Sequence, residues 1–594
     1  MRTRLLVVIV GSVLAATLAA PMAAEATGGT RGPVHPSAAL GHQDFTVTGT
    51  VPPRGRPVLL QQRTSKERWR TVARTHARRG GTYSLRTGHQ LAACRYVDLR
   101  VVAPAYAGHR KYVRSFTQRV IAAKATILVP AAVRPAEPFT VDGLLVPAAV
   151  RPVALQRRDA DGWVTVATSR SSKIGEVTFG GVTIPGATAE LRLSAPATRA
   201  LPLTRSRPAP VVAHDATPTP TTTVERLPGA VQPDGASYNP RISADGRYVA
   251  YQSLATNLPD GGGTADEPEI FLTDRSSGTT TRVTRTPSHR DTLDAISPDG
   301  RFLAFSSNAP TLVPRDANHM VPDVFVYDRT DASVSLESRA TNGTQSNDFS
   351  DSAQFVGSSG RYVAFRSDAT NLTPQHRAGL FLRDRRNGTT TLLRAGHRVP
   401  GTAGLAPMVG GPASADACDT NRGDDAQVTT FPGVDVQRVS PDAVGVVDDD
   451  TGEGLFSARS AVMSSNSRYV AYVFGAASGH VGDVLISDRQ THVTRRLPVD
   501  ADSSTLVAIS ADGRYVAIAG APDALGQESD AVQVSDWQNG QLWTVAAPSA
   551  DGWSYGGGSV AFSSGNELVF SSANPDLVPG DTNGVTDVFV ARLG

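Results

Sequence analysis

The stretch ISPDGRFLAF, from Ile296 to Phe305, decides how this chain is interpreted, because the chain repeats it several times. It combines a tight Asp-Gly turn with a strand in which apolar residues predominate. Variants of it begin at Ile242, Gly357, Ser464, Ile509 and, more weakly, Phe562. The turns recur at intervals of about fifty residues, with one interval close to twice that length, and such a period predicts a repeat architecture.

Each repeat contains four short segments with the pattern of antiparallel strands. Around Gly300, the segments DTLDAIS, RFLAFSS, DVFVYDR and SVSLESR follow one another, separated by turn-forming residues. The third segment is followed by an Asp, from Asp274 through Asp536, whose carboxylate can accept N–H bonds of the next turn. Four-stranded sheets repeated radially predict a β-propeller, because closing the ring protects the sheet edges.

The two ends of this region predict how the ring closes. The last repeat stops at DVFVARLG, Asp587 to Gly594, and lacks a fourth strand, whereas TTTVERLPG at Thr221 has the pattern of the fourth strands elsewhere. We therefore expect residues 221–594 to form a six-bladed propeller in which the first strand completes the last blade. Residues 397–455 are either an insertion or a degenerate blade, and their lack of the turn-strand signature favours an insertion.

The unit SPDGRFLAFSS…DVFVYDR resembles the blades of TolB-like propellers, which are relatives of WD-type blades without the Trp-Asp signature. The resemblance covers most of residues 225–594. It implies a ring-shaped binding platform without chemistry of its own, although a fold alone does not fix a function.

A repeat of another kind precedes the propeller region. FTVTGTV at Phe45 recurs as FTVDGLL at Phe139, and RPVLLQQR at Arg56 recurs as RPVALQRR at Arg151. Two copies of a module of this size, with alternating apolar and polar residues in its strands, predict two β-sandwiches. The pair resembles the immunoglobulin-like modules of exported bacterial proteins.

The sandwich modules are expected at residues 37–125 and 126–206, with a Pro- and Thr-rich linker at residues 207–220. Trp69 and Trp163 occupy equivalent positions in the two copies and are expected to be core residues under the sheet. The predicted fold class is therefore all-β: two tandem immunoglobulin-like β-sandwich modules followed by a six-bladed β-propeller.

The N-terminus has the composition of an export signal. Two arginines precede an apolar run, and Ala24-Glu25-Ala26 offers a cleavage site, so residues 1–26 are predicted to be a signal peptide. The alternative is an uncleaved anchor, for which the run is short. We expect a protein without a transmembrane anchor that is secreted or located in the cell envelope. Export would permit a disulfide between Cys94 and Cys418, but two free thiols are equally consistent with the sequence.

The net charge of +3 conceals an asymmetry between the parts of the chain. Residues 41–125 contain 17 Lys and Arg against 3 Asp and Glu, whereas residues 225–594 carry a net charge of −16. A dense positive field attracts anionic partners, here an anionic cell-wall polymer rather than nucleic acid. The candidate binding residues are Arg54, Arg56, Arg63, Lys66, Arg68, Arg70, Arg74, Arg78 and Arg79. The alternatives are an ordinary solvated surface and docking onto the acidic propeller.

Two loops carry oxygen-rich side chains in the same order, within VPRDANHMVPDVFV and VPGDTNGVTDVFV. Alternating oxygen donors on a tight loop suit Ca²⁺, the one cofactor suggested by the sequence. The candidate ligands are Asp316, Asn318 and Asp323 in the first loop and Asp581, Asn583 and Asp587 in the second. The alternative is that Asp and Asn form these turns without a metal.

No catalytic motif with a known mechanism occurs, so no catalytic residue is assigned and the chain is not expected to be an enzyme. The sequence predicts an exported, non-catalytic binding or scaffold protein. Its propeller face would bind a protein or glycan partner, and its basic sandwich module would tether it to anionic envelope polymers. Two alternatives remain: a glycan-active enzyme with a convergent active site in the propeller channel, and a structural envelope spacer.

Overall fold

The structure is a computed structural model that describes part of the chain. The described residues are 32–35, 38–40, 45–63, 68–87, 95–121, 123–147, 149–173, 175–198, 201–215, 220–227, 232–259, 267–286, 289–314, 316–318, 321–357, 359–393, 404–410, 425–431, 436–438, 458–474, 482–501, 505–520, 531–549 and 559–593. The predicted signal peptide and both cysteines lie outside these ranges. Within them, no helix has the length and apolar character needed to cross a membrane.

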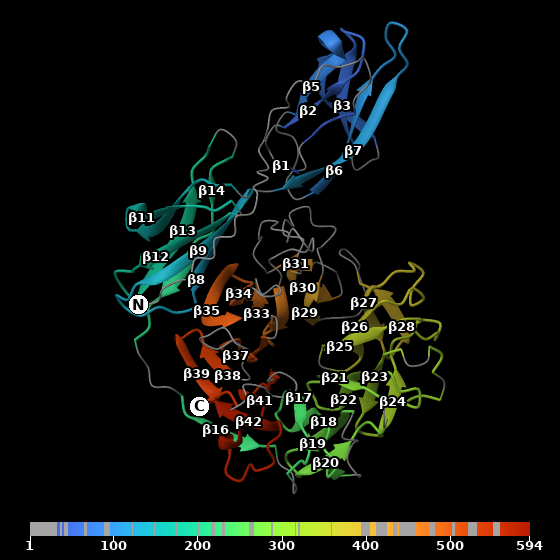
Figure 1. The fold of residues 1–594 in the computed structure, drawn as a ribbon, viewed down its shortest axis with the longest axis vertical. Coiled ribbons are helices and arrows are strands. Elements are labelled where there is room, and N and C mark those ends of the chain that lie inside the picture. The colour runs from blue at the N-terminus through green and yellow to red at the C-terminus, as the bar shows by residue number, and fades with distance from the viewer. Residues whose placement is uncertain are drawn as a thin grey trace. The chain divides into compact units, whose positions relative to one another are not determined.

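The regular structure of the described residues is almost entirely β. Apart from short 3₁₀ helices at Arg79–Gly81 and Pro575–Leu577, it consists of strands, most of them antiparallel (Figure 1). The chain forms two compact units, Met1–Ile121 and Ala122–Gly594.

In the first unit, two sheets enclose one core. The strands are β1 (Ala38–Leu40), β2 (Thr46–Thr50), β3 (Pro57–Arg63), β4 (Trp69–His76), β5 (Thr82–Arg86), β6 (Arg95–Ala103) and β7 (Tyr112–Ile121). Their order is β1-β7-β6-β3-β4 in the larger sheet, and β2 pairs with β5 in the smaller one. Val47 and Leu85 of the smaller sheet pack with Val58, Leu60 and Leu99 of the larger one, as alternation along the strands requires.

The prediction that Trp69 and Trp163 are core residues is wrong. Each is only partly buried, and an arginine guanidinium stacks over its indole, Arg100 at 4.2 Å from the Trp69 ring and Arg192 at 4.0 Å from the Trp163 ring. Trp69 is the register partner of the exposed Arg63, at the outward-facing positions of the two strands. Aliphatic side chains fill the inward positions, so the core is packed without the indole.

The second repeat also has two sheets around one core, which belongs to the second unit. Its strands are β8 (Lys124–Pro130), β9 (Phe139–Val146), β10 (Pro152–Asp159), β11 (Gly162–Arg170), β12 (Glu176–Val182), β13 (Thr188–Ala195), β14 (Thr204–Arg205) and β15 (Ala209–Val212). One sheet has the order β11-β10-β13, with β14 and β15 also paired to β13. Strand β15 lies within the predicted linker, residues 207–220, so that segment begins as part of the sandwich.

The propeller region contains seven sheets, counted over the described residues. They are β17 (Ser237–Ile242), β18 (Tyr248–Ser253), β19 (Glu269–Asp274) and β20 (Thr279–Arg282); β21 (Asp291–Ile296), β22 (Phe302–Ser307), β23 (Asp323–Asp328) and β24 (Ser333–Leu336); β25 (Ser350–Val356), β26 (Tyr362–Ser367), β27 (Gly379–Asp384) and β28 (Thr389–Leu392); β29 (Gly404–Gly410), β30 (Asp425–Phe431) and β31 (Val436–Arg438); β32 (Ala458–Met463), β33 (Tyr469–Phe474), β34 (Gly482–Asp488) and β35 (Val493–Ala501); β36 (Leu506–Ile509), β37 (Tyr515–Ala519), β38 (Val532–Asp536) and β39 (Gln541–Ala546); and β40 (Val560–Phe562), β41 (Glu567–Ser572), β42 (Asp587–Leu593) and β16 (Thr222–Arg226).

These sheets form a closed ring of seven blades rather than the predicted six. The first strands contact one another in the order β17, β21, β25, β29, β32, β36 and β40, and β40 contacts β17 (Figure 1). The three described strands of the extra sheet, β29, β30 and β31, lie within residues 397–455, the segment for which the sequence analysis favoured an insertion over a degenerate blade. Its strands pair with one another without the Asp-Gly turn, or a variant of it, that identifies the other blades.

The prediction for ring closure is confirmed. Strand β16 pairs antiparallel with β42, with Thr222 opposite Leu593 and Arg226 opposite Phe589. The first strand of the propeller region therefore completes the last blade, and its backbone hydrogen bonds join the two ends of the ring.

The second sandwich shares a sheet with one propeller blade. Strand β8 pairs in parallel with β35, with Leu128 opposite Thr494 and Pro130 opposite Arg496, which gives the order β12-β9-β8-β35-β34-β33-β32. Val493 packs in the sandwich core. The boundary between compact units therefore falls after Ile121, not between the second sandwich and the propeller.

In five blades, the turn between the first and second strands is held by an ion pair of the same kind. In the second blade, Gly300 has φ +69°, and the carboxylate of Asp299 accepts a hydrogen bond from the Arg301 backbone N–H at 3.1 Å. The Arg301 guanidinium donates to Asp328, at the end of the third strand, and its hydrogen bonds hold the pKa of Asp328 well below the ordinary value. The equivalent pairs are Arg247–Asp274, Arg361–Asp384, Arg468–Asp488 and Arg514–Asp536.

In three blades, the same turn also packs against an aromatic ring of the preceding blade. A Cβ atom on Gly300 would overlap the ring of Tyr248 in the preceding blade, and one on Gly360 would overlap the ring of Phe302. The Arg329 guanidinium covers the Tyr248 ring at 4.2 Å from its centroid. Glycine is therefore required here both for its positive φ and for the space that its missing side chain leaves.

We expect Gly300→Ala to lower the free energy of unfolding of the propeller by about 2–4 kcal/mol, because strain at positive φ and overlap with Tyr248 act together. The matched control is Gly278→Ala: Gly278 has the same φ of +69°, but a Cβ atom there would have no neighbour within 4 Å. The control should cost about 1 kcal/mol in urea unfolding. Equal losses in the two variants would show that the contact between blades adds nothing.

Candidate functional site

The innermost strands of the propeller carry β-bulges. Strands β17, β21, β25 and β32 each show a register shift against the second strand of their blade. Two residues at these bulges, Asn239 and Ser352, have positive φ values of 52° and 54°. A bulge redirects the side chains beside it, so polar residues of these strands leave the regular alternation that serves the core.

Side chains of the first blade hold the inward edge of β21. Gln252 accepts the Leu293 backbone N–H at 3.1 Å, and Asn239 donates to the Leu293 carbonyl at 2.8 Å. The Arg241 guanidinium donates through Nε to the carbonyl of Asp294 at 3.1 Å. These side chains take the hydrogen-bonding positions that a further strand would occupy along β21. They also place Arg241 beside the bulge that contains Asp294.

Asp294 is the most strongly perturbed carboxylate of this cluster. Burial raises its pKa to about 7, and the charge of Asp351 adds to the shift. Hydrogen bonds from Ser306, whose Oγ lies 2.6 Å from Oδ2, and from the Ala353 backbone oppose it, as does the charge of Arg241. Asp294 is therefore protonated over a wide range of pH below neutrality.

The neighbouring carboxylate, Asp351, is incompletely bonded. Burial raises its pKa, whereas the Arg366 guanidinium and a hydrogen bond from Ser352 lower it. Its buried Oδ1 has no hydrogen-bond partner among the described residues. Arg241, Asp294 and Asp351 thus form a charged cluster on three successive inner strands, and we call it the channel cluster.

None of the three residues of the channel cluster was predicted from the sequence. A signal was present, because Arg241 and Asp294 are charged residues in the segments that lead directly into the Asp-Gly turns. The bulges that bring the three side chains together change the strand register, which residue spacing does not reveal.

The raised pKa of Asp294 predicts a pH dependence of stability. Because the folded-state pKa, about 7, lies above the unfolded value of about 4, the folded state binds this proton more tightly, and the resulting stabilisation is lost as the pH rises from about 4 to about 7. Asp294→Asn keeps the site neutral, so its melting temperature should fall less between about pH 5 and pH 8 than that of the wild type. Asp331→Asn, on the exposed turn between β23 and β24, serves as the control. An equal decline in all three proteins would contradict the role given to Asp294.

The first predicted calcium loop gathers its residues around an amide rather than a cation. The Gln345 Nε2 atom lies 2.8 Å from Asp316 Oδ1, 3.0 Å from Asn318 Oδ1 and 2.6 Å from Asp323 Oδ2. Asp323 is buried and also accepts a hydrogen bond from Ser338 at 2.6 Å. Burial raises the pKa of Asp323, and these hydrogen bonds oppose the shift.

The second predicted calcium loop uses another glutamine in the same way. Gln232 donates to Asp581 at 2.9 Å, and Asn583 donates to Asp587 at 3.0 Å. Arg226 lies 3.7 Å from the Asp587 carboxylate, whose pKa is raised to about 6 chiefly by burial. In both loops the predicted residues come together, and each glutamine belongs to the connection into the next blade.

No group of three or more His, Cys, Asp and Glu side chains within the described ranges could hold a metal ion. In the first loop a cation would have to displace the Gln345 amide from the three oxygens. Calcium binding by these loops stays a prediction, and the contacts present join neighbouring blades through hydrogen bonds.

We expect Gln345→Ala to destabilise the propeller by about 1–3 kcal/mol, because it removes a donor from the buried Asp323 carboxylate. Gln375→Ala, at an exposed position, is the matched control and should change the free energy of unfolding by less than about 0.5 kcal/mol. Urea unfolding measures both. A loss for Gln345→Ala no larger than that of the control would mean that the amide does not hold the blades together.

The predicted basic site divides into buried and exposed residues, and Arg56 does not belong to it. Arg56 is 2% exposed, and its guanidinium donates to the carbonyls of Pro52, Ala103, Pro104 and Arg110. It is a structural residue of the sandwich and cannot meet a partner. Its counterpart in the second repeat, Arg151, is buried in the same way.

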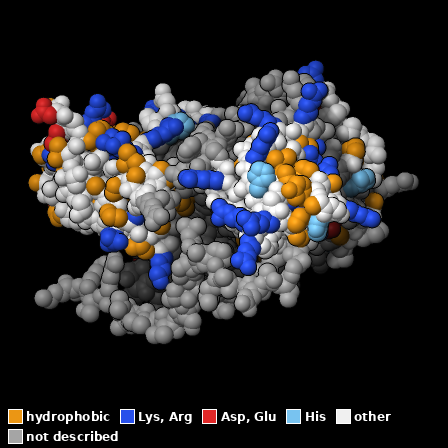
Figure 2. Space-filling view, turned by 90° about the horizontal axis from the view of Figure 1, so that it is seen from above, with side chains coloured by type: hydrophobic (Ala, Val, Ile, Leu, Met, Phe, Trp, Pro, Cys, Tyr) orange, Lys and Arg blue, Asp and Glu red, His pale blue; other side chains and the backbone are white. Residues whose placement is uncertain are grey.

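The remaining basic residues are mostly at the surface. Those exposed are Arg54, Arg63, Arg68, Arg70, Arg74, Arg78 and Arg79. Arg63 lies 3.8 Å from Asp98, and Lys66 lies outside the described residues. In Figure 2 Lys and Arg side chains are spread over the visible described surface and few Asp or Glu side chains are seen. An anionic partner for this surface stays an untested prediction.

Neither a protein-family model nor a curated protein sequence matches the chain. Among solved structures it is similar to the β-propeller domain of the Trilobed protease from Pyrococcus furiosus, with 11% identity and a TM-score of 0.32 over 71% of this chain and 98% of that one. It is also similar to a prolyl endopeptidase, with 11% identity and a TM-score of 0.31 over 76% and 55% of the two chains. For the tricorn protease the identity is 10% and the TM-score is 0.24, over 88% of this chain and 47% of that one.

The three solved structures named above are peptidases or the propeller domain of one, so the prediction of a non-catalytic binding or scaffold protein is not retained. Neither of its alternatives, a glycan-active enzyme and an envelope spacer, is retained. At 10–11% identity the likeness itself extends to the propeller fold alone. The propeller fold itself agrees with the sequence analysis.

Proposed function

We propose that the channel cluster binds a positively charged amino group of a peptide and that the chain has a peptidase-related role in which the propeller holds the peptide. The observation that carries this proposal is the buried Oδ1 of Asp351, which has no hydrogen-bond partner in the described part of the chain. A buried acceptor without a donor is costly, and an ammonium group supplies both the missing donor and a compensating charge.

The surroundings of Asp351 fit such a ligand. Asp294 lies near enough for the two carboxylates to affect each other's protonation, and bringing a cation between them favours ionisation of both. Ser352 and Gln354, next to Asp351 on β25, are exposed and can bond to a peptide backbone. Arg241 is held by backbone carbonyls of its own and the next blade, so it does not neutralise the site by pairing directly with Asp351.

The architecture that we propose with this function is two immunoglobulin-like modules before a TolB-like propeller. The first module is supported by two sheets around one core, and the second by a similar pair of sheets with its core extended to the propeller. The TolB-like relationship is supported by the repeated Asp-Gly-Arg-aromatic turn.

The proposal predicts that the full chain binds a fluorescent peptide with a free N-terminal lysine and that acetylation of both amino groups weakens binding. Asp351→Asn should raise the Kd about tenfold, because a hydrogen bond between charged groups is lost. Fluorescence anisotropy measures the Kd, and mass spectrometry of the recovered peptide reports whether it is cleaved.

Asp331→Asn, on the exposed turn of the second blade, is the control and should bind like the wild type. The proposal fails if the wild type does not bind the peptide, or if Asp351→Asn and the acetylated peptide both bind with unchanged Kd.

A further inference from the structure

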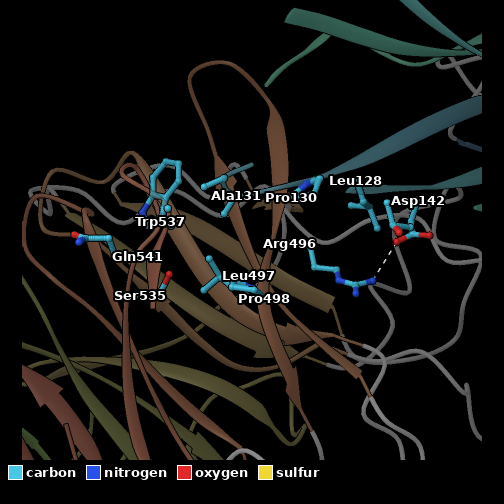
Figure 3. A pocket seen from close by; sticks show the side chains of 13 residues that line it. Leu128, Pro130, Ala131, Asp142, Arg496, Leu497, Pro498, Ser535, Trp537 and Gln541 are labelled. Carbon is cyan, nitrogen blue, oxygen red and sulfur yellow. Dashed lines mark hydrogen bonds and ion pairs between the residues drawn. The ribbon is translucent and has the colours of Figure 1, made fainter. Parts of the chain in front are cut away.

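A pocket lies where the second sandwich meets the propeller, and nothing in the channel cluster contributes to it. It has a volume of about 280 Å³. Its lining residues come from the sandwich and from the two blades that contain β35 and β38. The side chains labelled in Figure 3 are Leu128, Pro130, Ala131, Asp142, Arg496, Leu497, Pro498, Ser535, Trp537 and Gln541.

One end of this junction pocket carries a pair of opposite charges. Arg496 Nη1 donates to Asp142 Oδ2 at 3.1 Å, and the two side chains point toward each other in Figure 3. Arg496 Nε also lies 3.3 Å from Asp483, and Asp142 Oδ1 accepts a hydrogen bond from Thr178. The Arg496 side chain is 41% exposed and that of Asp142 is 23% exposed, so both charges remain accessible to a ligand.

The rest of the junction pocket is mainly apolar. Leu128, Pro130 and Leu497 form its wall between the charged end and Trp537. The Trp537 indole is fixed, because its Nε1 donates to the Gly513 carbonyl at 2.7 Å and its ring packs edge-on against the ring of Tyr469. The aromatic surface is therefore in place before any ligand arrives.

We propose that the junction pocket binds a small zwitterion with an apolar side chain, a free amino acid or a dipeptide. The ligand carboxylate would accept hydrogen bonds from the Arg496 guanidinium, and its ammonium group would donate to the Asp142 carboxylate. An apolar side chain would lie against Pro130, Leu497 and Trp537. The volume is at the lower end of known ligand sites, about 300 Å³, and suits a molecule of this size.

The paired charges are what select a zwitterion. Arg496 is shared between Asp142 and Asp483. A ligand with a single charge would engage only Arg496 or only Asp142, whereas a zwitterion engages both and so replaces the pairing that it interrupts. Such a ligand would also touch the sandwich and two blades at once. Its binding would therefore stabilise the shared sheet in which Leu128 lies opposite Thr494.

The test uses the full chain with leucyl-leucine as the probe, and calorimetry and thermal unfolding as readouts. Leucyl-leucine should bind and raise the melting temperature. N-acetyl-leucyl-leucine and leucyl-leucinamide, which each lack one charge, should bind at least about tenfold more weakly. This comparison needs no variant and so does not depend on the folding of a mutant protein.

Arg496→Gln and Asp142→Asn should each raise the Kd for leucyl-leucine about tenfold. The matched control is Arg158→Gln, which breaks the 3.0 Å pair of Arg158 and Glu190 elsewhere on the same sandwich and should leave binding unchanged. The inference is overturned if the wild type does not bind leucyl-leucine, or if both capped ligands bind as well as the zwitterion. Asp351→Asn should leave this binding intact, so failure here is distinguishable from failure of the proposed function.

Discussion

The contact between a glycine of one blade and an aromatic ring of the preceding blade is the constraint on which the propeller depends. Gly300, Gly360 and Gly513 all have positive φ, and each lies where a side chain would overlap the ring of the blade before it. The neighbouring arginine is tied to the Asp that ends the third strand, which fixes the turn against its own blade. One short motif thus fixes the strands within a blade and the spacing between blades.

The closing blade keeps this constraint with different chemistry. Its turn has Asn566 at φ 60° in place of glycine and Glu567 in place of arginine. Glu567 receives hydrogen bonds from Arg592 of its own blade and from Arg275 of the first blade. Ion pairs between the closing blade and the first blade therefore hold these two blades together, as aromatic packing holds other neighbouring blades. They supplement the backbone pairing of β16 with β42.

Because these turns, together with the second and third strands, fix the ring, the inner strands are free to depart from regular pairing. The bulges on β17, β21 and β25 cost ladder bonds, and side chains such as Gln252 restore some of them. Irregular strands on a rigid scaffold are a common place for binding residues, and the channel cluster is built in this way. The junction pocket has a comparable origin, since it lies beside the sheet that the sandwich and one blade share.

The sequence alone determined the repeated turn, the all-β ring and its closure, because turn chemistry is local and an unfinished last repeat needs a partner strand. It did not determine the seventh blade, whose strands pair without that turn. It also misplaced Arg56, because the carbonyls that enclose its guanidinium come from residues as distant in the chain as Arg110. Asp294 and Asp351 belong to different repeats, and only the bulges and the packing of successive blades bring their charges together. Long-range contacts of this kind depend on the folded backbone, so only the tertiary structure decided where the candidate site lies.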